Sequence, residues 1–173
     1  IHSPSKFWLV MATSLDRLKW YKDGRIRPCQ MPRIGGRSLA AAIGARCILY
    51  SGERFLLAVH HSYLPISRNR WGLPGGRVES GESAEAATRR EMNEELGIEI
   101  GELIDCGDYR YKGTLHKVFG TRFDGALGAV DYNEIERIGW HSFDEVADLK
   151  RRGRLHTGFE LEAIDAFLRM LEP

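Results

Sequence analysis

Hydrophobic residues gather into two long runs near position 50, and each run has the character of a buried strand. We predict strands over 39–50 and 54–61, because continuous apolar runs are typical of strands covered on both faces. The segment 51–53 between them contains Gly52 and predicts a hairpin turn. Three more strands are predicted further along the chain. They cover 102–111, 115–124 and 137–140, with a turn at 112–114.

Three segments carry helix signals. The first covers 83–96, with Ser83 as a good N-cap and Gly97 where a helix end favours a left-handed residue. Capping-box sequences at 142–145 and 157–160 predict a short helix and a longer final one. The apolar stripe of the final helix consists of Leu161, Ile164, Leu168 and Leu171, with Phe167 beside it. Strands and helices in this mixed order predict one α+β or α/β sandwich.

The composition is that of an ordinary globular chain. Its 173 residues are 43% hydrophobic and 28% charged, which allows one domain with a full core and an additional arm. A formal net charge of +1 gives no strong field for nucleic acid or membranes, so we expect neither DNA nor a membrane as a partner. Three widely spaced cysteines without a CxxC pair predict a reducing, cytoplasmic environment. The first residue is Ile1, so a removed targeting segment stays an open alternative.

The first 37 residues differ from the rest of the chain. Between 17 and 37 there are seven Lys or Arg residues and one Asp. We therefore predict a basic N-terminal extension over 1–37 and a separate domain over 38–173. A solvated or homodimer-contacting extension is one interpretation, and attraction of a phosphate-rich substrate is the other.

The segment 76–98 carries the clearest chemistry. Glu91, Glu94 and Glu95 have the i, i+3, i+4 spacing that sets them on one face of the predicted helix. Like charges four residues apart destabilise a helix by roughly 0.2–0.5 kcal/mol per pair, so the cluster gains a purpose only with a cation. Clustered carboxylates are hard oxygen ligands of the kind that Mg²⁺ or Mn²⁺ prefers. A solvated acidic face is the alternative interpretation.

The same segment resembles the Nudix box, the sequence motif of the Nudix hydrolase superfamily. The motif reads G-x5-E-x7-R-E-U-x-E-E-x-G-U, where U is an aliphatic or similar residue, and all its specified positions are matched. The matching residues are Gly76, Glu82, Arg90, Glu91, Met92, Glu94, Glu95, Gly97 and Ile98. The resemblance implies an α+β Nudix fold, an α/β/α sandwich with a mixed β-sheet between helices, over 38–173.

The resemblance also implies roles for these side chains. The implied ligands of Mg²⁺, with Mn²⁺ as the alternative ion, are Gly76, Glu82, Glu91, Glu94 and Glu95. Arg90 would orient the glutamates, and Glu91 is the first choice for the general base that takes a proton from water. Glu134 is the alternative base outside the box, and an ordinary surface acid is the other interpretation of Glu134.

Residues just before the box are candidates for substrate binding. Arg68 and Arg70 are predicted to contact phosphate, with a solvated loop as the alternative. Trp71 is predicted to stack on a base, with packing in the core or at its rim as the alternative.

The predicted function is metal-dependent hydrolysis of a phosphoanhydride bond in a nucleoside diphosphate linked to another group. The expected substrate is a small nucleotide, either a nucleoside triphosphate or a nucleotide sugar. An RNA 5′-end pyrophosphohydrolase and a catalytically silent Nudix-like binding domain are the two alternatives. The basic extension at 1–37 alone favours RNA, and the complete glutamate set argues against a silent domain.

Overall fold

The computed structural model describes residues 44–61 and 69–172. The strands are β1 (Gly44–Ser51), β2 (Arg54–His60), β3 (Ile104–Tyr111), β4 (Thr114–Arg122) and β5 (Ile135–Ser142), and the helices are α1 (Ala84–Leu96), α2 (Phe143–Arg151) and α3 (Glu160–Leu171). Each strand and helix predicted from the sequence is therefore confirmed, with its ends shifted by a few residues. The predicted extension over 1–37, the strand residues 39–43 and Arg68 lie outside the described residues.

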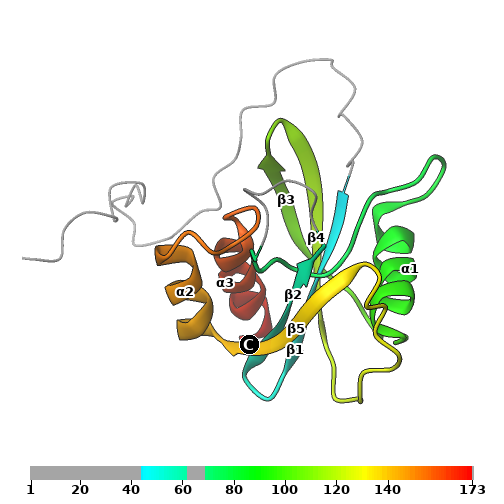
Figure 1. Ribbon diagram of the computed structural model, residues 1–173. Helices are drawn as coiled ribbons and strands as arrows, with labels where there is room; N and C mark the ends of the chain where they lie inside the picture. The colour runs from blue at the N-terminus through cyan, green and yellow to red at the C-terminus, as the bar shows by residue number, and fades with distance from the viewer. Residues whose placement is uncertain (1–43, 62–68, 173) are drawn as a thin grey trace, which may run out of the picture. The chain divides into compact units, whose positions relative to one another are not determined.

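The strands form one mixed sheet in the order β3-β4-β1-β2-β5 (Figure 1). β1 pairs with β4 in parallel, and the other neighbouring strands are antiparallel. Gly52 and Glu53 join β1 to β2 with φ angles of 51° and 64°. Positive φ at both central residues is what a type I′ hairpin turn requires, so the predicted turn has the backbone geometry expected of it.

Helices cover both faces of the sheet. Cys47 and Leu49 of β1 pack with Met92 and Leu96 of α1, whereas Ile48 lies in the other core cluster. That second cluster includes Val146 of α2 and Ala163, Ile164 and Phe167 of α3. Alternate strand residues thus enter opposite layers, as the pleat of a strand demands. Figure 1 shows α1 on one side of the sheet and α2 with α3 on the other, and this confirms the predicted α/β/α sandwich.

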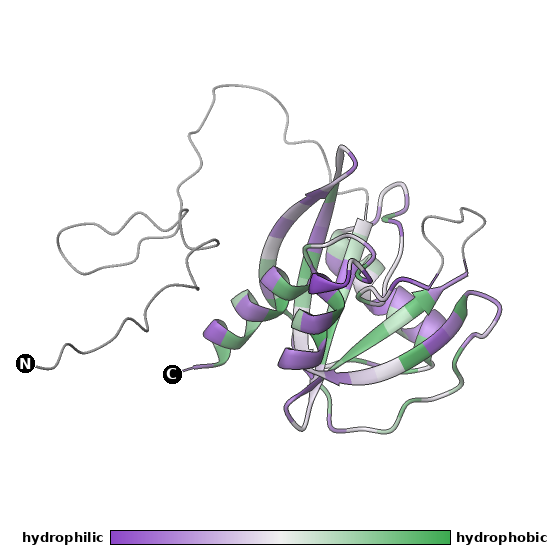
Figure 2. Cartoon of the chain, turned by 60° about the vertical axis from the view of Figure 1, so that its left-hand side comes forward, coloured by the Kyte–Doolittle hydropathy of each residue, from purple (hydrophilic) through white to green (hydrophobic). Residues whose placement is uncertain are grey.

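The colouring by hydropathy shows the same layering. In Figure 2 hydrophobic residues are concentrated on the central strands, and hydrophilic and hydrophobic residues alternate along the helices. This alternation is the pattern of helices that bury one side only. Within the described part of the chain, no helix is long and apolar enough to cross a membrane.

Helix α1 has the ends that its sequence predicted. The Ser83 hydroxyl accepts a hydrogen bond from the Ala86 amide at 3.1 Å. Gly97 follows the last turn with φ 62°, and its amide donates to the carbonyls of Asn93 and Met92. Both ends are fixed by local contacts, which holds the helix at one register for the glutamates it carries.

The start of α3 differs from its prediction. We expected Thr157 to cap the helix, but the helix begins at Glu160 and the Thr157 hydroxyl has no hydrogen-bond partner. Glu160 instead reaches back, and its carboxylate accepts from the amides of Thr157 and Gly158 at 2.8 and 2.7 Å. The predicted apolar stripe is also shifted. Its fully buried residues are Ala163, Ile164 and Phe167, and Leu161, Leu168 and Leu171 pack at the edge of the core.

The packing of α3 on the sheet can be tested at Gly120 in β4. A Cβ atom added there would lie 2.2 Å from Cδ2 of the fully buried Phe167. We expect Gly120→Ala to lower the free energy of unfolding by about 1–3 kcal/mol, the usual cost of overpacking. Gly101 has open space around it, so Gly101→Ala should change the same quantity by less than about 0.5 kcal/mol. Urea denaturation measures both values, and equal effects would contradict this packing.

Candidate active site

Arg90 lies at the centre of a group of carboxylates on α1 and the loop before it. Its Nε atom is 3.0 Å from Glu82 Oε1, and its Nη1 atom is 3.0 Å from Glu91 Oε1 and 2.8 Å from Glu94 Oε2. The Nη2 atom donates to the Arg77 carbonyl at 3.0 Å. Hydrogen bonds from Arg90 lower the pKa of Glu82, and the same carboxylates raise the pKa of Arg90. One guanidinium therefore orients three acids that would otherwise repel one another.

Glu95 points away from Arg90 and into the protein. It is 2% exposed, and its Oε2 atom accepts a hydrogen bond from the Gly75 amide at 2.8 Å. Its Oε1 atom is 2.7 Å from Nε2 of His60 at the end of β2. Both carboxylate oxygens thus have partners, as a buried acid requires. Glu95 joins α1 to the glycine loop and to the sheet.

Glu91 lies against the backbone of the glycine loop. A Cβ atom at Gly76 would lie 2.3 Å from Glu91 Oε1, so only glycine leaves room for this carboxylate. Burial raises the pKa of Glu91, and the neighbouring charges of Glu95 and Glu94 raise it further, although Arg90 opposes them. The carboxylate is therefore short of positive charge, which is the condition that a bound cation would relieve.

The carboxylates suit a hard divalent cation in their donor chemistry. In the ranges 44–61 and 69–172, however, no three His, Cys, Asp or Glu side chains converge on one point that could hold a metal ion. The reason lies in the contacts above: Glu91 and Glu94 face Arg90, while Glu95 faces Gly75 and His60. A cation shared by these acids would replace part of the Arg90 contacts. The predicted ligand set, with the Gly76 carbonyl that accepts from the Ala45 amide at 3.0 Å, remains a prediction.

The other predicted site residues lie apart from this group. The Trp71 ring packs against His141 at 4.7 Å between centroids, and the Arg137 guanidinium lies 5.4 Å from its centroid. Arg70 reaches the Leu155 carbonyl only at the 3.5 Å limit of a hydrogen bond. Glu134 is exposed, and its carbonyl accepts from the His61 amide at 2.9 Å. This contact places the backbone of Glu134 beside the end of β2, next to His60, which bonds Glu95. The role of Glu134 as the alternative base stays a prediction.

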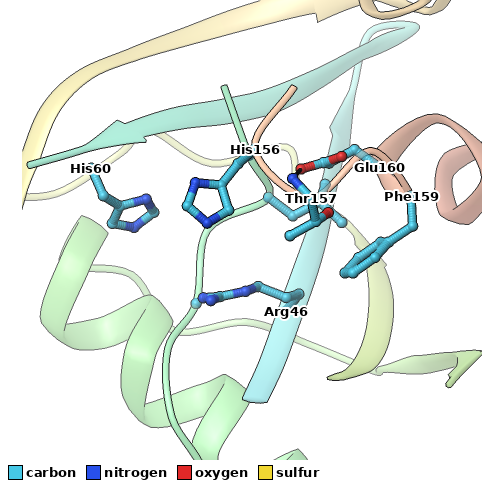
Figure 3. A pocket seen from close by; sticks show the side chains of 9 residues that line it. Arg46, His60, His156, Thr157, Phe159 and Glu160 are labelled. Carbon is cyan, nitrogen blue, oxygen red and sulfur yellow. Dashed lines mark hydrogen bonds between the residues drawn. The ribbon is translucent and has the colours of Figure 1, made fainter. Parts of the chain in front are cut away.

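A pocket of about 140 Å³ lies beside the glutamates, and the sequence did not indicate it (Figure 3). Its lining includes Arg46, His60, Gly75, His156, Phe159 and Glu160. His60 and Gly75 are the two partners of Glu95, so the pocket and the acid cluster share a wall. One signal was available: Arg46 is a single charge within the otherwise apolar segment 44–49.

One of the two histidines of this pocket, His156, is held neutral. Burial, assisted by the charge of Arg46, lowers the pKa of His156 to about 4. Glu160, which is 1% exposed, is the acid of the same wall, and its carboxylate accepts hydrogen bonds from the two backbone amides before α3.

Comparisons with known proteins identify the family of the chain. The NUDIX domain family model matches residues 40–158, and the chain therefore belongs to the Nudix family. It is 51% identical over 103 residues to "Putative 8-oxo-dGTP diphosphatase 2" of Mycobacterium tuberculosis, covering 50% of this chain and 73% of that protein. It is 33% identical over 102 residues to "Putative 8-oxo-dGTP diphosphatase" of Bacillus subtilis, covering 57% of this chain and 65% of that protein.

Two further matches extend the comparison. An RNA pyrophosphohydrolase of Bartonella henselae is 28% identical over 102 residues, which cover 49% of this chain and 58% of that protein. The crystal structure of a MutT NUDIX hydrolase from Burkholderia pseudomallei is 27% identical with a TM-score of 0.53, covering 61% of this chain and 85% of that chain. The predicted family and fold are thus confirmed. Hydrolases of this family generally use divalent cations such as Mg²⁺.

The neutral state of His156 makes stability depend on pH. Its pKa is about 4 in the folded protein and 6.5 for an ordinary histidine, so between these values only the unfolded chain binds the proton. Stability should therefore fall as the pH is lowered from 6.5 to 4. We expect His156→Gln to remove part of this slope, whereas His61→Gln, at an exposed position, should keep it. Urea unfolding at several pH values measures the slopes, and identical slopes for His156→Gln and the wild type would refute the assignment.

Proposed function

We propose that this protein hydrolyses a phosphoanhydride bond of a nucleoside triphosphate with the help of a divalent cation. This proposal rests on one observation: a single residue, Glu95, connects the acid cluster to the pocket. Glu95 belongs to the acid cluster, and its partners His60 and Gly75 line the pocket. A nucleotide with its base side in the pocket would thereby present its phosphates to the acids.

The residues of the chain divide the chemical work. A divalent cation, when bound by Glu91, Glu94 and Glu95, supplies neutralising charge to the diphosphate and lowers the pKa of water. Arg90 holds Glu82, Glu91 and Glu94 in one orientation. Glu91, whose pKa burial raises, is suited to accept the proton of the attacking water. Water adds to phosphorus, the bridging P–O bond breaks, and its electron pair leaves with the departing phosphate.

The size of the pocket favours a single base. A cavity of about 150 Å³ accepts one benzene ring in a well-studied engineered protein, and this pocket of about 140 Å³ is comparable in volume. The names of the Mycobacterium and Bacillus relatives refer to 8-oxo-dGTP, and this supports a triphosphate, including one with an oxidised base. A nucleotide sugar is the remaining small-molecule alternative.

An RNA 5′-end pyrophosphohydrolase is the second candidate. The relative of that name from Bartonella henselae supports it, at a lower identity than the two diphosphatases. The chemistry at phosphorus would be the same, and only the group that follows the first nucleotide would differ.

A nucleotide panel tests the proposal. We expect release of pyrophosphate or phosphate from nucleoside triphosphates, including 8-oxo-dGTP, in Mg²⁺ and none in EDTA. Chromatography of the products identifies the bond that is cut. Activity confined to nucleotide sugars or to triphosphorylated RNA would replace the proposed substrate, and no activity on any member of the panel would refute the enzyme.

The buried glutamate gives a second test. Glu95→Gln keeps an oxygen that can accept from the Gly75 amide but removes the negative charge. We expect turnover to fall by about a hundredfold or more, within the range usual for lost acid–base or metal function, with little change in the urea midpoint in EDTA. Glu85→Gln is the matched control, because Glu85 is exposed on the same helix and pairs with Arg89. Near-wild-type turnover of Glu95→Gln would exclude its proposed role.

A further inference from the structure

Arg46 is a charged residue in the middle of the buried sheet. Its neighbours Ala45 and Cys47 are completely buried, and the backbone on either side is bonded to the glycine loop. Because side chains alternate along a strand, Arg46 lies on the sheet face of Ile48, opposite the α1 layer. From there it lines the pocket together with His60 and His156. The side chain of Arg46 is partly exposed in the pocket, and burial of the rest lowers the pKa of its guanidinium, so an anion bound in the pocket would stabilise its charge.

The described residues provide no anionic partner for Arg46 at close range. None of them forms a hydrogen bond or ion pair with the Arg46 side chain among the contacts of residues 44–61 and 69–172. The acids that favour its charge at longer range are Glu95, Glu91 and Glu160, in that order. Figure 3 shows the guanidinium below His156 and toward His60, with Phe159 on the other side of the pocket. Its charged end is therefore directed to the side where the pocket meets the acid cluster.

We propose that Arg46 is a phosphate-binding residue, whose guanidinium donates hydrogen bonds to an oxygen of the substrate's phosphate chain from the pocket side. This inference rests on the proposed function, since it assumes that a nucleotide occupies the pocket. A guanidinium is the side chain best matched to phosphate, because it stays protonated and offers donors in one plane. The two histidines of the lining are otherwise engaged: the His60 ring is bonded to Glu95, and burial keeps His156 neutral.

The placement also balances charge across the reaction centre. The acids with a bound cation would hold the phosphate chain from one side, and Arg46 would hold it from the other. A base contact is the competing role for Arg46. The base would lie toward Phe159, however, which belongs to the apolar part of the lining. The guanidinium faces the other way, so Arg46 is expected to act on every nucleotide alike.

Binding to inert substrates separates these roles. The probes are triphosphates of adenosine and guanosine in which methylene replaces both the α,β and the β,γ bridging oxygens, with Mg²⁺, and the two nucleosides without phosphate, all measured by calorimetry. We expect Arg46→Met to lower the affinity for both triphosphate analogues by about tenfold to a hundredfold, which is the effect of losing a charged hydrogen bond. Binding of the nucleosides should not change. Arg110→Met, at an exposed position on β3, is the control and should bind all four like the wild type.

Arg46→Lys keeps the charge among Glu91, Glu95 and Glu160, so it preserves the fold should the methionine variant unfold. The affinity of Arg46→Lys for both analogues should still fall by about threefold or more, because an ammonium group lacks the planar set of donors. A loss confined to one base, an equal loss for nucleosides and analogues, or unchanged binding in the folded variants would overturn the proposal. These measurements need no turnover, so a protein that failed to hydrolyse nucleotides would refute the proposed function and leave this result readable.

Discussion

The geometry of the site depends on the buried carboxylate of Glu95, held between the Gly75 amide and the His60 ring. A carboxylate that is 2% exposed cannot be solvated, so it is stable only where protein groups satisfy its oxygens. Its two partners come from the glycine loop and from β2. Their bonds therefore fix the depth and rotation of α1 against the sheet. The orientation of Glu91 and Glu94, one turn or less from Glu95, follows from that of the helix.

The outer side of α1 is governed by repulsion rather than by burial. Glu82, Glu91 and Glu94 lie close to one another, and Arg90 is the cation that keeps them together. An arginine can do this for three acids because its donors point in several directions within one plane. Arg90 compensates the negative charge only in part, since burial and the other acids still raise the pKa of Glu91. A cation bound beside Glu91 would relieve this residual repulsion.

The sequence predicted those parts of the site that depend on contacts between residues close together in the chain. Helix α1 was predictable because Ser83 and Gly97 fix its ends within one turn, and the spacing of the glutamates then sets their face. The start of α3 was not, because Glu160 reaches back to the amides of Thr157 and Gly158 while the Thr157 hydroxyl caps nothing, and the burial of Glu160 depends on the pocket around it. The pocket itself is lined by strand, loop and helix residues more than a hundred positions apart. A local sequence pattern cannot predict that such distant residues lie together. Arg46 was the only trace of it in the sequence.

The backbone of the glycine loop explains how the acid cluster and the pocket can coexist. The Ala45 and Cys47 amides donate to the carbonyls of Gly76 and Pro74, and these hydrogen bonds hold the loop against β1. One face of this loop touches Glu91 and Glu95, and the other lines the pocket. The far wall of the pocket, with His156 and Glu160, comes from the segment before α3 and makes no contact with the acids of α1 in the described hydrogen bonds. If the pocket holds the base as proposed, substitutions in that wall would change which nucleotide fits while the acid cluster keeps its geometry.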